Sequence, residues 1–362
     1  MSRLRVMHLV VGGDIGGAER LLTQLARRSE QTGAIHQAAV ITPNRALADY
    51  LASSGVTIHD RGAARDNPFA YLYRSLGPAD VAWLTALLVA ERIDLVHTHT
   101  FASHVLGTRA ARRAGLPQVR TEHHVMHYFD PSCSPFTRWA AARTERFIAV
   151  SRYVHSVLAR TAPAAAARTT VVRNGVDPMY WVAGPATEGA LRVGIVCRLT
   201  AWKRVHLAIE AAALAEVDLL VVGEGEERRR LEALARLRGA SVTFVGRHAD
   251  PRPFVAQCDA ILNTSDDEPL GLSVLEALAM ERPVIAFAGG GIPEIVQPGV
   301  TGWLVSDATA EAFAGAILRA RADRAGLRAM GVEGRRFVVA HCDLGRMCEG
   351  YRAVYQSASK AS

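Results

Sequence analysis

Lysine is almost absent from this chain of 362 residues, in which Lys203 and Lys360 stand against 40 arginines. Lys360 lies in a Ser/Ala-rich tail, so Lys203 is the one lysine expected in the folded part of the protein. Long apolar runs are also missing, because no stretch approaches the ~20 uncharged residues that a membrane-spanning helix needs. The basic N-terminus runs at once into a Gly-rich loop, without the apolar region of a signal peptide, so we interpret it as the first strand.

Cysteine is scarce and scattered, with five residues and no Cys-x-x-Cys spacing. An odd number of cysteines without paired spacing favours neither a disulfide framework nor a zinc site. The simplest compartment for such a chain is the reducing cytoplasm.

Positive charge is concentrated in the first half of the chain. Residues 1–175 hold 21 Lys+Arg against 12 Asp+Glu, a net charge of +9, together with ten of the thirteen histidines. The remaining residues have a net charge of −2. This asymmetry predicts an anionic partner for the first half, although GC-rich coding that favours arginine would produce the same excess.

Short apolar runs alternate with longer amphipathic ones, which is typical of parallel sheets covered by helices. The pattern runs twice and predicts an α/β fold with two doubly wound, Rossmann-like domains that face each other across a cleft. We expect an N-terminal domain over 1–176, a C-terminal domain over 177–341, and a helix and tail over 342–362 that pack back toward the N-terminal domain. The turn-rich stretch Val176–Gly189 marks the boundary. The expected strands are Arg5–Val11, Gln37–Thr42, Thr57–Asp60, Leu95–Thr98, Gln118–Thr121 and Phe147–Val150, then Leu191–Cys197, Asp218–Val222, Ser241–Val245, Ala260–Asn263, Pro283–Phe287 and Trp303–Val305.

One apolar segment after a strand carries the strongest chemical signal. Between Pro269 and Met280 the only charged residue is Glu276, so the helix expected there would be buried nearly all round. A buried carboxylate is costly unless it is hydrogen-bonded, and sugar or ribose hydroxyls are suitable donors. The alternative is a solvent-facing Glu276.

The start of the same helix predicts a phosphate site. The helix is expected to begin near Gly271, which leaves the amides of about Leu272 and Ser273 free to bind a phosphate. Glu268 lies in the loop before these amides, where we expect it to lie over the group attached to the phosphate. The alternative is a loop glutamate without a role in binding.

Arg198 and Lys203 form a second candidate site. Arg198 follows the expected strand Leu191–Cys197, and Lys203 opens the next helix, so the two cations can converge on one pyrophosphate. The alternative is a pair of surface cations. The Gly-rich segments Gly12–Gly17 and Gly223–Arg228 lack the Gly-x-Gly-x-x-Gly spacing of dinucleotide sites, which argues against a nicotinamide enzyme.

Several short motifs follow one another along nearly the whole chain, and together they resemble glycosyltransferase family 4. They are Gly16-Gly-Ala-Glu19, Arg173-Asn-Gly-Val-Asp177, Arg198 with Lys203, Glu268-x7-Glu276, Gly289–Glu294 and Gly299-Val-Thr-Gly302. The resemblance implies the GT-B fold and transfer of a sugar with retention of anomeric configuration. The chain departs from the family pattern at Pro269-Leu270-Gly271, where Gly-Phe-Gly is common.

The resemblance also assigns roles on the donor side. Arg198 and Lys203 would neutralise the donor diphosphate, Glu276 would hold the ribose, and Glu268 would contact the sugar hydroxyls. The amides of Gly271 and Leu272 would lie near that sugar.

Further roles follow from the same resemblance. Gly223 and the turn at Val245–Gly246 would flank the nucleobase. Gly16 and Gly17 would approach the diphosphate, and His123 would face the reacting sugar, with His124 as the competing candidate.

From this resemblance we expect a hexose or N-acetylhexosamine to pass from a UDP- or GDP-sugar to a hydroxyl of a lipid-linked or cell-surface glycan. No metal cofactor is expected, because no paired Asp-x-Asp motif occurs in a suitable loop. A further expectation is reversible contact of the cytoplasmic protein with an anionic membrane, through a helical patch of Arg109, Arg112 and Arg113.

Two alternatives remain at this point. The first is a nucleotide-sugar epimerase on the same fold. The second is a basic nucleic-acid-binding protein, which the dispersal of the arginines over many elements disfavours.

Overall fold

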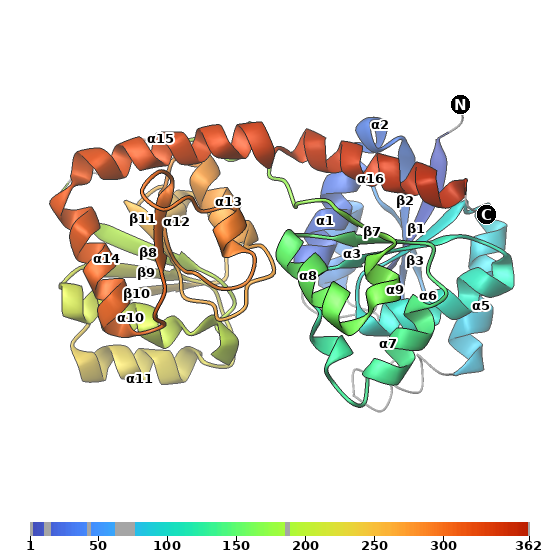
Figure 1. The fold of residues 1–362 in the computed structure, drawn as a ribbon, viewed down its shortest axis with the longest axis horizontal. Coiled ribbons are helices and arrows are strands. Elements are labelled where there is room, and N and C mark those ends of the chain that lie inside the picture. The colour runs from blue at the N-terminus through green and yellow to red at the C-terminus, as the bar shows by residue number, and fades with distance from the viewer. Residues whose placement is uncertain (1–2, 11–15, 42–44, 62–76, 185–188, 361–362) are drawn as a thin grey trace. The chain divides into compact units, whose positions relative to one another are not determined.

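The computed structural model describes residues 3–10, 16–41, 45–61, 77–184 and 189–360. The chain divides into two compact units (Figure 1). The N-terminal unit combines Met1–Asn174 with Leu344–Ser362, and the C-terminal unit is Gly175–Asp343. The C-terminal unit is therefore inserted into the N-terminal one.

The N-terminal unit is built on a seven-stranded parallel sheet of order β3-β2-β1-β4-β5-β6-β7. Its strands are β1 Leu4–Val10, β2 Ala34–Val40, β3 Thr57–Asp60, β4 Leu95–Thr98, β5 Gln118–Glu122, β6 Arg146–Ala149 and β7 Thr169–Val171. Its helices are α1 Gly17–Arg27, α2 Ser29–Thr32, α3 Arg45–Ala52, α5 Pro78–Ala90, α6 Phe101–Ala114, η1 Met126–Tyr128, α7 Ser134–Ala141, α8 Arg152–Thr161, α9 Pro163–Ala166 and α16 Leu344–Ser359.

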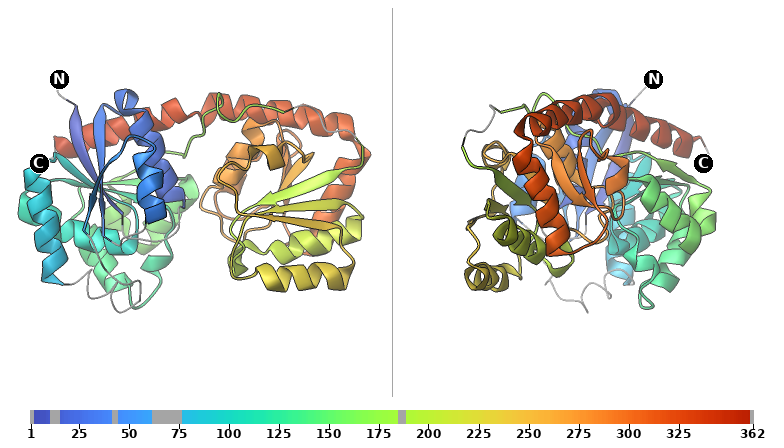
Figure 2. Two further views of the ribbon diagram at one scale, coloured as in Figure 1. Left: turned by 180° about the vertical axis from the view of Figure 1, so that it is seen from behind. Right: turned by 60° about the vertical axis from the view of Figure 1, so that its left-hand side comes forward.

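Helices cover both faces of this sheet, as Figure 2 shows. On one face, Leu21 and Leu25 of α1 join Tyr351 and Tyr355 of α16 in a core with the strands. On the other face, α5 and α6 pack over β1 and β4. The last helix of the chain thus completes the core that the first strand begins.

The C-terminal unit repeats this plan with a six-stranded parallel sheet of order β10-β9-β8-β11-β12-β13. The strands are β8 Arg192–Val196, β9 Asp218–Val222, β10 Val242–Gly246, β11 Ala260–Asn263, β12 Val284–Phe287 and β13 Gly302–Val305. The helices are η2 Ala201–Lys203, α10 Val205–Ala215, α11 Arg228–Arg238, α12 Arg252–Val255, α13 Leu272–Ala279, η3 Ile292–Glu294, α14 Ala310–Ala322 and α15 Arg324–His341.

The predicted α/β class is confirmed, and a strand lies at each of the twelve expected places; Val11 and Thr42, the expected ends of the first two strands, lie outside the described residues. The strand β7 was missed, because three residues are too few to show a period. Lys203 was expected to open a helix, but it ends the 3-10 turn η2, and α10 begins two residues later. Among the described helices, none is long and apolar enough to cross a lipid bilayer.

The core of the N-terminal unit contains an unusual number of histidines. His8, His36, His97 and His99 are all at most 5% exposed. Burial lowers the pKa of His36 to about 3 and lowers the pKa of the other three rings well below the ordinary value. The folded protein therefore keeps these rings neutral where an unfolded chain would protonate them.

We expect this unit to lose stability in mild acid. As the pH falls below about 6.5, the unfolded state takes up protons that the folded state excludes, and each such ring lowers the free energy of unfolding by up to about 1.4 kcal/mol per pH unit. Urea unfolding between pH 8 and 4.5, with hydrogen exchange to locate the opening, measures the effect. The expectation is wrong if the C-terminal unit opens first while residues 3–174 stay protected.

Candidate active site

In the C-terminal unit the strand order reverses between β8 and β11, which lie side by side at the centre of the sheet. Ligands of such sheets bind outside the carboxyl ends of the strands at this reversal, because the two following loops diverge there. The loop after β8 carries Arg198 and Lys203, and the loop after β11 carries Glu268. The topology therefore brings the sequence-predicted residues to one place.

Lys203 and Glu268 form an ion pair. The Lys203 Nζ lies 2.5 Å from Oε2 of Glu268, and the two side chains are only 13% and 11% exposed. The ammonium also lies 3.9 Å from the centre of the Trp202 ring, a favourable cation–π contact. The backbone is fixed as well, because the Thr264 hydroxyl donates to the carbonyl of Lys203 at 2.7 Å. The one lysine of the folded body is thus held in place by the β11 loop.

Arg198 stands apart from this pair. Its side chain is exposed, and within the described ranges its guanidinium makes no hydrogen bond or ion pair. Arg204, in contrast, pairs with Asp266 at 2.6 Å and so belongs to the local structure of the loops. Lys203 is therefore not a solvated surface cation.

The helix α13 begins where the sequence predicted. Gly271 precedes it with a φ of 93°, a conformation that disfavours a side chain, and its carbonyl accepts from the amides of Val274 and Leu275. The amides of Leu272 and Ser273 therefore have no acceptor within the helix.

Glu276 lies in the second turn of α13 and is only 7% exposed. The solvent-facing alternative for this carboxylate is therefore wrong.

A glycine loop after β12 shapes the Glu268 loop, a role that sequence reasoning missed. Gly291 donates its amide to the carbonyl of Glu268 at 2.8 Å. A Cβ on Gly290 would lie 2.2 Å from the same carbonyl oxygen, and one on Gly289 would lie 2.3 Å from that of Asp266. The Gly289–Glu294 motif was recognised only by resemblance. Its physical reason is this close contact of two backbones at neighbouring strands.

Gly223 and the Val245–Gly246 turn meet at the ends of β9 and β10. The Gly223 amide donates to the carbonyl of Gly246 at 2.8 Å. A Cβ on Gly223 would lie 1.8 Å from the Cys197 carbonyl oxygen, so no other residue fits at this φ of 147°. Gly223 therefore packs closely against the backbone of Cys197, where the loop after β8 begins.

The reversal in the N-terminal unit lies between β1 and β4. Gly16 and Gly17 stand after β1 at the start of α1, where the Gly16 amide donates to the Glu19 carboxylate at 2.8 Å. His123 and His124 follow β5, the next strand beyond β4. The half-buried His123 contacts His99 through Nε2 and Nδ1 at 3.2 Å, whereas His124 is exposed.

A buried ion pair lies under the His123 loop and was missed by sequence reasoning. Arg120 and Glu122 form a two-point contact, with Nε–Oε1 at 2.5 Å and Nη2–Oε2 at 2.9 Å. Glu122 also accepts from the hydroxyl of Tyr128 at 2.9 Å. The Arg120 guanidinium, next to His127, holds the pKa of Glu122 well below its usual range despite burial. The sequence offered one signal for this ion pair, because Arg120 and Glu122 are two residues apart on a strand and their side chains therefore share a face.

The arginines expected on the acceptor side do not meet His123. Arg112 and Arg113 are exposed in the last turn of α6, and Arg109 donates to the carbonyl of Gly77 at 3.3 Å. The helix runs back from the carboxyl end of β4 toward the start of β5, so its last turn lies about 20 Å from the edge that carries His123. Cations there stabilise the helix C-terminus, which is a structural reason for their presence.

Two family models match the chain. The model described as Glycosyltransferase Family 4 covers residues 15–180, and the model described as Glycosyl transferases group 1 covers residues 190–323. The first match covers most of the N-terminal unit before residue 175, and the second lies within the C-terminal unit.

Individual proteins agree with these models. An alpha-maltose-1-phosphate synthase of Mycolicibacterium smegmatis is 28% identical, over 90% of this chain and 95% of that protein. A D-inositol 3-phosphate glycosyltransferase of Actinosynnema mirum is 31% identical, over 70% of this chain and 71% of that protein. The crystal structure of Anabaena Alr3699/HepE in complex with UDP and glucose superposes with a TM-score of 0.87 at 22% identity, covering 98% of this chain and all of that one. The chain is therefore a glycosyltransferase of the GT-B fold and belongs to family 4, with a group 1 domain as its C-terminal unit.

Proposed function

We propose that this glycosyltransferase moves a hexose or N-acetylhexosamine from a UDP- or GDP-sugar to a hydroxyl acceptor, with retention of configuration. The observation that carries the proposal is the Lys203–Glu268 pair at the strand reversal of the C-terminal unit, next to the free amides of α13. A cation, a carboxylate and a helix N-terminus in one place suit a sugar linked to a diphosphate.

The proposed chemistry places charge stabilisation in the C-terminal unit. As the bond between the sugar C1 and the diphosphate oxygen breaks, negative charge grows on the leaving diphosphate. Lys203 and the amides of Leu272 and Ser273 would stabilise it, with Arg198 as a second cation that is free to move. Glu268 would then exchange its contact with Lys203 for hydroxyls of the sugar. We propose that no metal ion takes part.

A nucleotide sugar as donor has support beyond the site. The similar Anabaena protein Alr3699/HepE binds UDP with glucose in one crystal structure and UDP-glucose in another. An epimerase on the same fold would act without an acceptor, so incubation of the donor alone distinguishes it. The basic nucleic-acid-binding alternative has no support from the two family models, which both describe glycosyltransferases.

The acceptor is proposed to be anionic, on the net charge of +9 in residues 1–175. Relatives named for α-maltose 1-phosphate and D-inositol 3-phosphate make a small phosphate ester an acceptor class to test beside lipid-linked glycans. The α6 arginines lie at the far end of the sheet, so we do not propose that they bind a small phosphate ester. They remain a candidate contact for an anionic membrane only.

Binding of the donor tests the proposal first. We expect UDP or GDP, with the matching sugar nucleotide, to raise the melting temperature of the protein, because a ligand of the folded state stabilises it. Glu276→Ala should weaken that binding by roughly 1–3 kcal/mol, since the ribose would lose a buried acceptor. Calorimetry on the folded variant measures this, with Glu311→Ala, an exposed glutamate of α14, as the control. Unchanged affinity in Glu276→Ala would remove the ribose role.

Lys203→Arg should lower turnover at least about tenfold, equal to about 1.4 kcal/mol in the barrier. A guanidinium is planar and larger than an ammonium, so it would place its charge differently between Glu268 and the Trp202 ring. Steady-state kinetics with the identified donor measures the loss. Arg230→Lys, at a surface pair with Glu227, is the control for the reverse exchange. Full activity in Lys203→Arg would show that charge alone, without shape, is required.

His123→Ala should reduce turnover and leave the affinity for the nucleoside diphosphate nearly intact. The diphosphate is proposed to bind residues of the C-terminal unit, whereas His123 would contact the sugar. The same pair of measurements on His124→Ala is the matched comparison. A larger turnover loss in His124→Ala would move the role to that residue, and a large loss of diphosphate affinity in His123→Ala would contradict the assignment.

A further inference from the structure

Four imidazoles and one hydroxyl form a continuous hydrogen-bonded row inside the N-terminal unit. We call this set the histidine row: Thr32, His36, His8, His99 and His123. The contacts are Thr32 Oγ1 to His36 Nε2 at 2.9 Å, His36 Nδ1 to His8 Nε2 at 2.8 Å, His8 Nδ1 to His99 Nε2 at 3.0 Å, and His99 Nδ1 to His123 Nε2 at 3.2 Å. Each inner ring uses both of its nitrogens.

Strand register explains why the row exists. The rings come from β2, β1 and the ends of β4 and β5, which are consecutive neighbours in the sheet. His36 pairs with Val6, two residues before His8, and His8 pairs with His97, two residues before His99. Side chains two apart share a face of a strand, so the row climbs one step per strand toward the carboxyl edge. It ends at the residue proposed to contact the sugar.

The protonation pattern of the row can be worked out. Burial lowers the pKa of all four rings, so each is neutral, with one N–H and one lone pair. A neutral row has two polarities, that is, two directions in which all of its hydrogen bonds can point. Fixing the proton on one ring fixes it on all the others. The hydroxyl of Thr32 decides between them: it lies 3.2 Å from the carbonyl oxygen of Ser29, to which it can donate.

If Thr32 donates to Ser29, it accepts from Nε2–H of His36, and every contact in the row is used. Each ring then carries its proton on Nε2 and accepts on Nδ1. In the opposite polarity the Thr32 proton turns to His36 and the contact with Ser29 is lost. The first polarity makes one hydrogen bond more and is therefore favoured.

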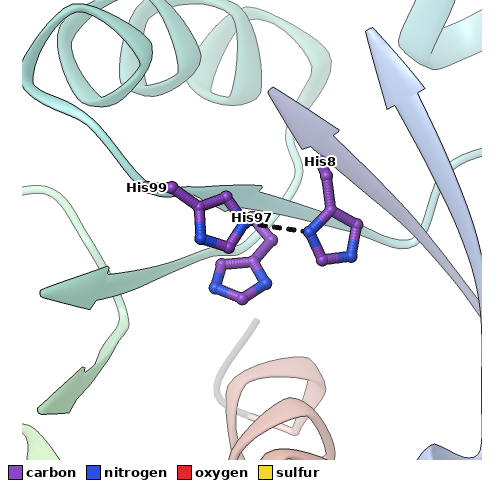
Figure 3. A group of neighbouring side chains, drawn as sticks. All are labelled: His8, His97 and His99. Atoms are coloured by element: carbon purple, nitrogen blue, oxygen red, sulfur yellow. Dashed lines mark hydrogen bonds between the residues drawn. The ribbon is translucent and has the colours of Figure 1, made fainter. Parts of the chain in front are cut away.

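A metal site is the competing explanation for part of this cluster. His8, His97 and His99 each offer a nitrogen within 4.8 Å of the others (Figure 3). The facing nitrogens of His8 and His99 are already bonded to each other, and His97 bonds Tyr355 at 2.9 Å and Thr121 at 2.8 Å. A metal ion held by all three rings would have to break these hydrogen bonds. Hydrogen bonds within the row and those of His97 to Tyr355 and Thr121 account for every nitrogen of these three rings without a metal.

We propose that the histidine row holds His123 in the Nε2–H tautomer, so that its Nδ1 lone pair accepts a hydrogen bond from a hydroxyl of the bound sugar. Among the described residues, the one hydrogen bond of the His123 ring is that of Nε2 with His99, which leaves Nδ1 without a partner. The other members of the row are positioning residues, which act through His123. The contact with a sugar rests on the proposed function, whereas the tautomer does not.

Nitrogen-15 NMR of the full-length, ligand-free protein tests the tautomer. Two-bond proton–nitrogen spectra of histidine-labelled protein, assigned with single His→Gln variants, show which nitrogen of each ring carries the proton. We expect all four rings of the row to be Nε2–H tautomers. Nδ1–H on any of them overturns the proposal. Nδ1–H on His99 alone, with signals that change when Zn²⁺ is added or chelated, would establish the metal site instead.

A variant at the far end of the row tests its action on His123. Thr32→Val removes the hydroxyl with little change of shape, so the spectrum of His123 should lose its single tautomer, and Thr32→Ser should rescue it. Turnover should fall about two- to tenfold, because one hydrogen bond favours the Nε2–H tautomer by about this factor. The KM for the donor should stay unchanged. Thr23→Val is the matched control, a buried threonine of the same unit whose hydroxyl contacts Arg20 and Tyr50.

The two arms separate failure of the row from failure of the proposed function. If no nucleotide sugar is turned over, the spectra of Thr32→Val still test the row. If His123→Ala loses turnover while Thr32→Val changes neither the spectrum nor the rate, the row does not act on His123. If Thr23→Val produces the same changes as Thr32→Val, the effect is one of general packing, and the proposal is wrong.

Discussion

Each unit depends on one topological constraint, the reversal of strand order beside the first strand of its sheet. Parallel strands bring all their carboxyl ends to one edge, and the reversal leaves the loops after two central strands free to diverge there. In the C-terminal unit these loops hold Lys203 and Glu268 as a nearly buried ion pair. In the N-terminal unit they hold Gly16 and His99, and the next loop holds His123.

The sequence predicted the parts of this arrangement that are local. Glu276 was expected to be buried because it is the only charge in an apolar helix, and the structure buries it. Gly271 was expected at the helix start and stands there. The register of neighbouring strands is a different matter, because it relates residues that are far apart along the chain. His36, His8 and His99 are separated by 28 and 91 residues, so no spacing reveals their contact.

The pairing of Lys203 with Glu268 was missed for a related reason. Both residues were assigned to the donor, Lys203 to its diphosphate and Glu268 to its sugar, and each was treated as unpaired before the donor binds. A cation and a carboxylate that lie side by side in a half-buried loop satisfy each other first, because an unpaired charge there is costly. In the proposed function, donor binding would therefore have to offer each of them more than the partner it gives up.

The C-terminal helix ties the polar core of the N-terminal unit together. Tyr355 bonds His97, and Tyr351 bonds Thr121, which also bonds His97 at its other nitrogen. These two tyrosines are fully buried, so a polar core that β1, β4 and β5 begin is closed only by residues more than 220 positions later. A chain ending before α16 would leave His97 and Thr121 without these tyrosine partners. The core of the N-terminal unit is thus completed by residues that follow the C-terminal unit in the chain. The neutral histidine row, which lies next to His97, therefore depends on the last helix.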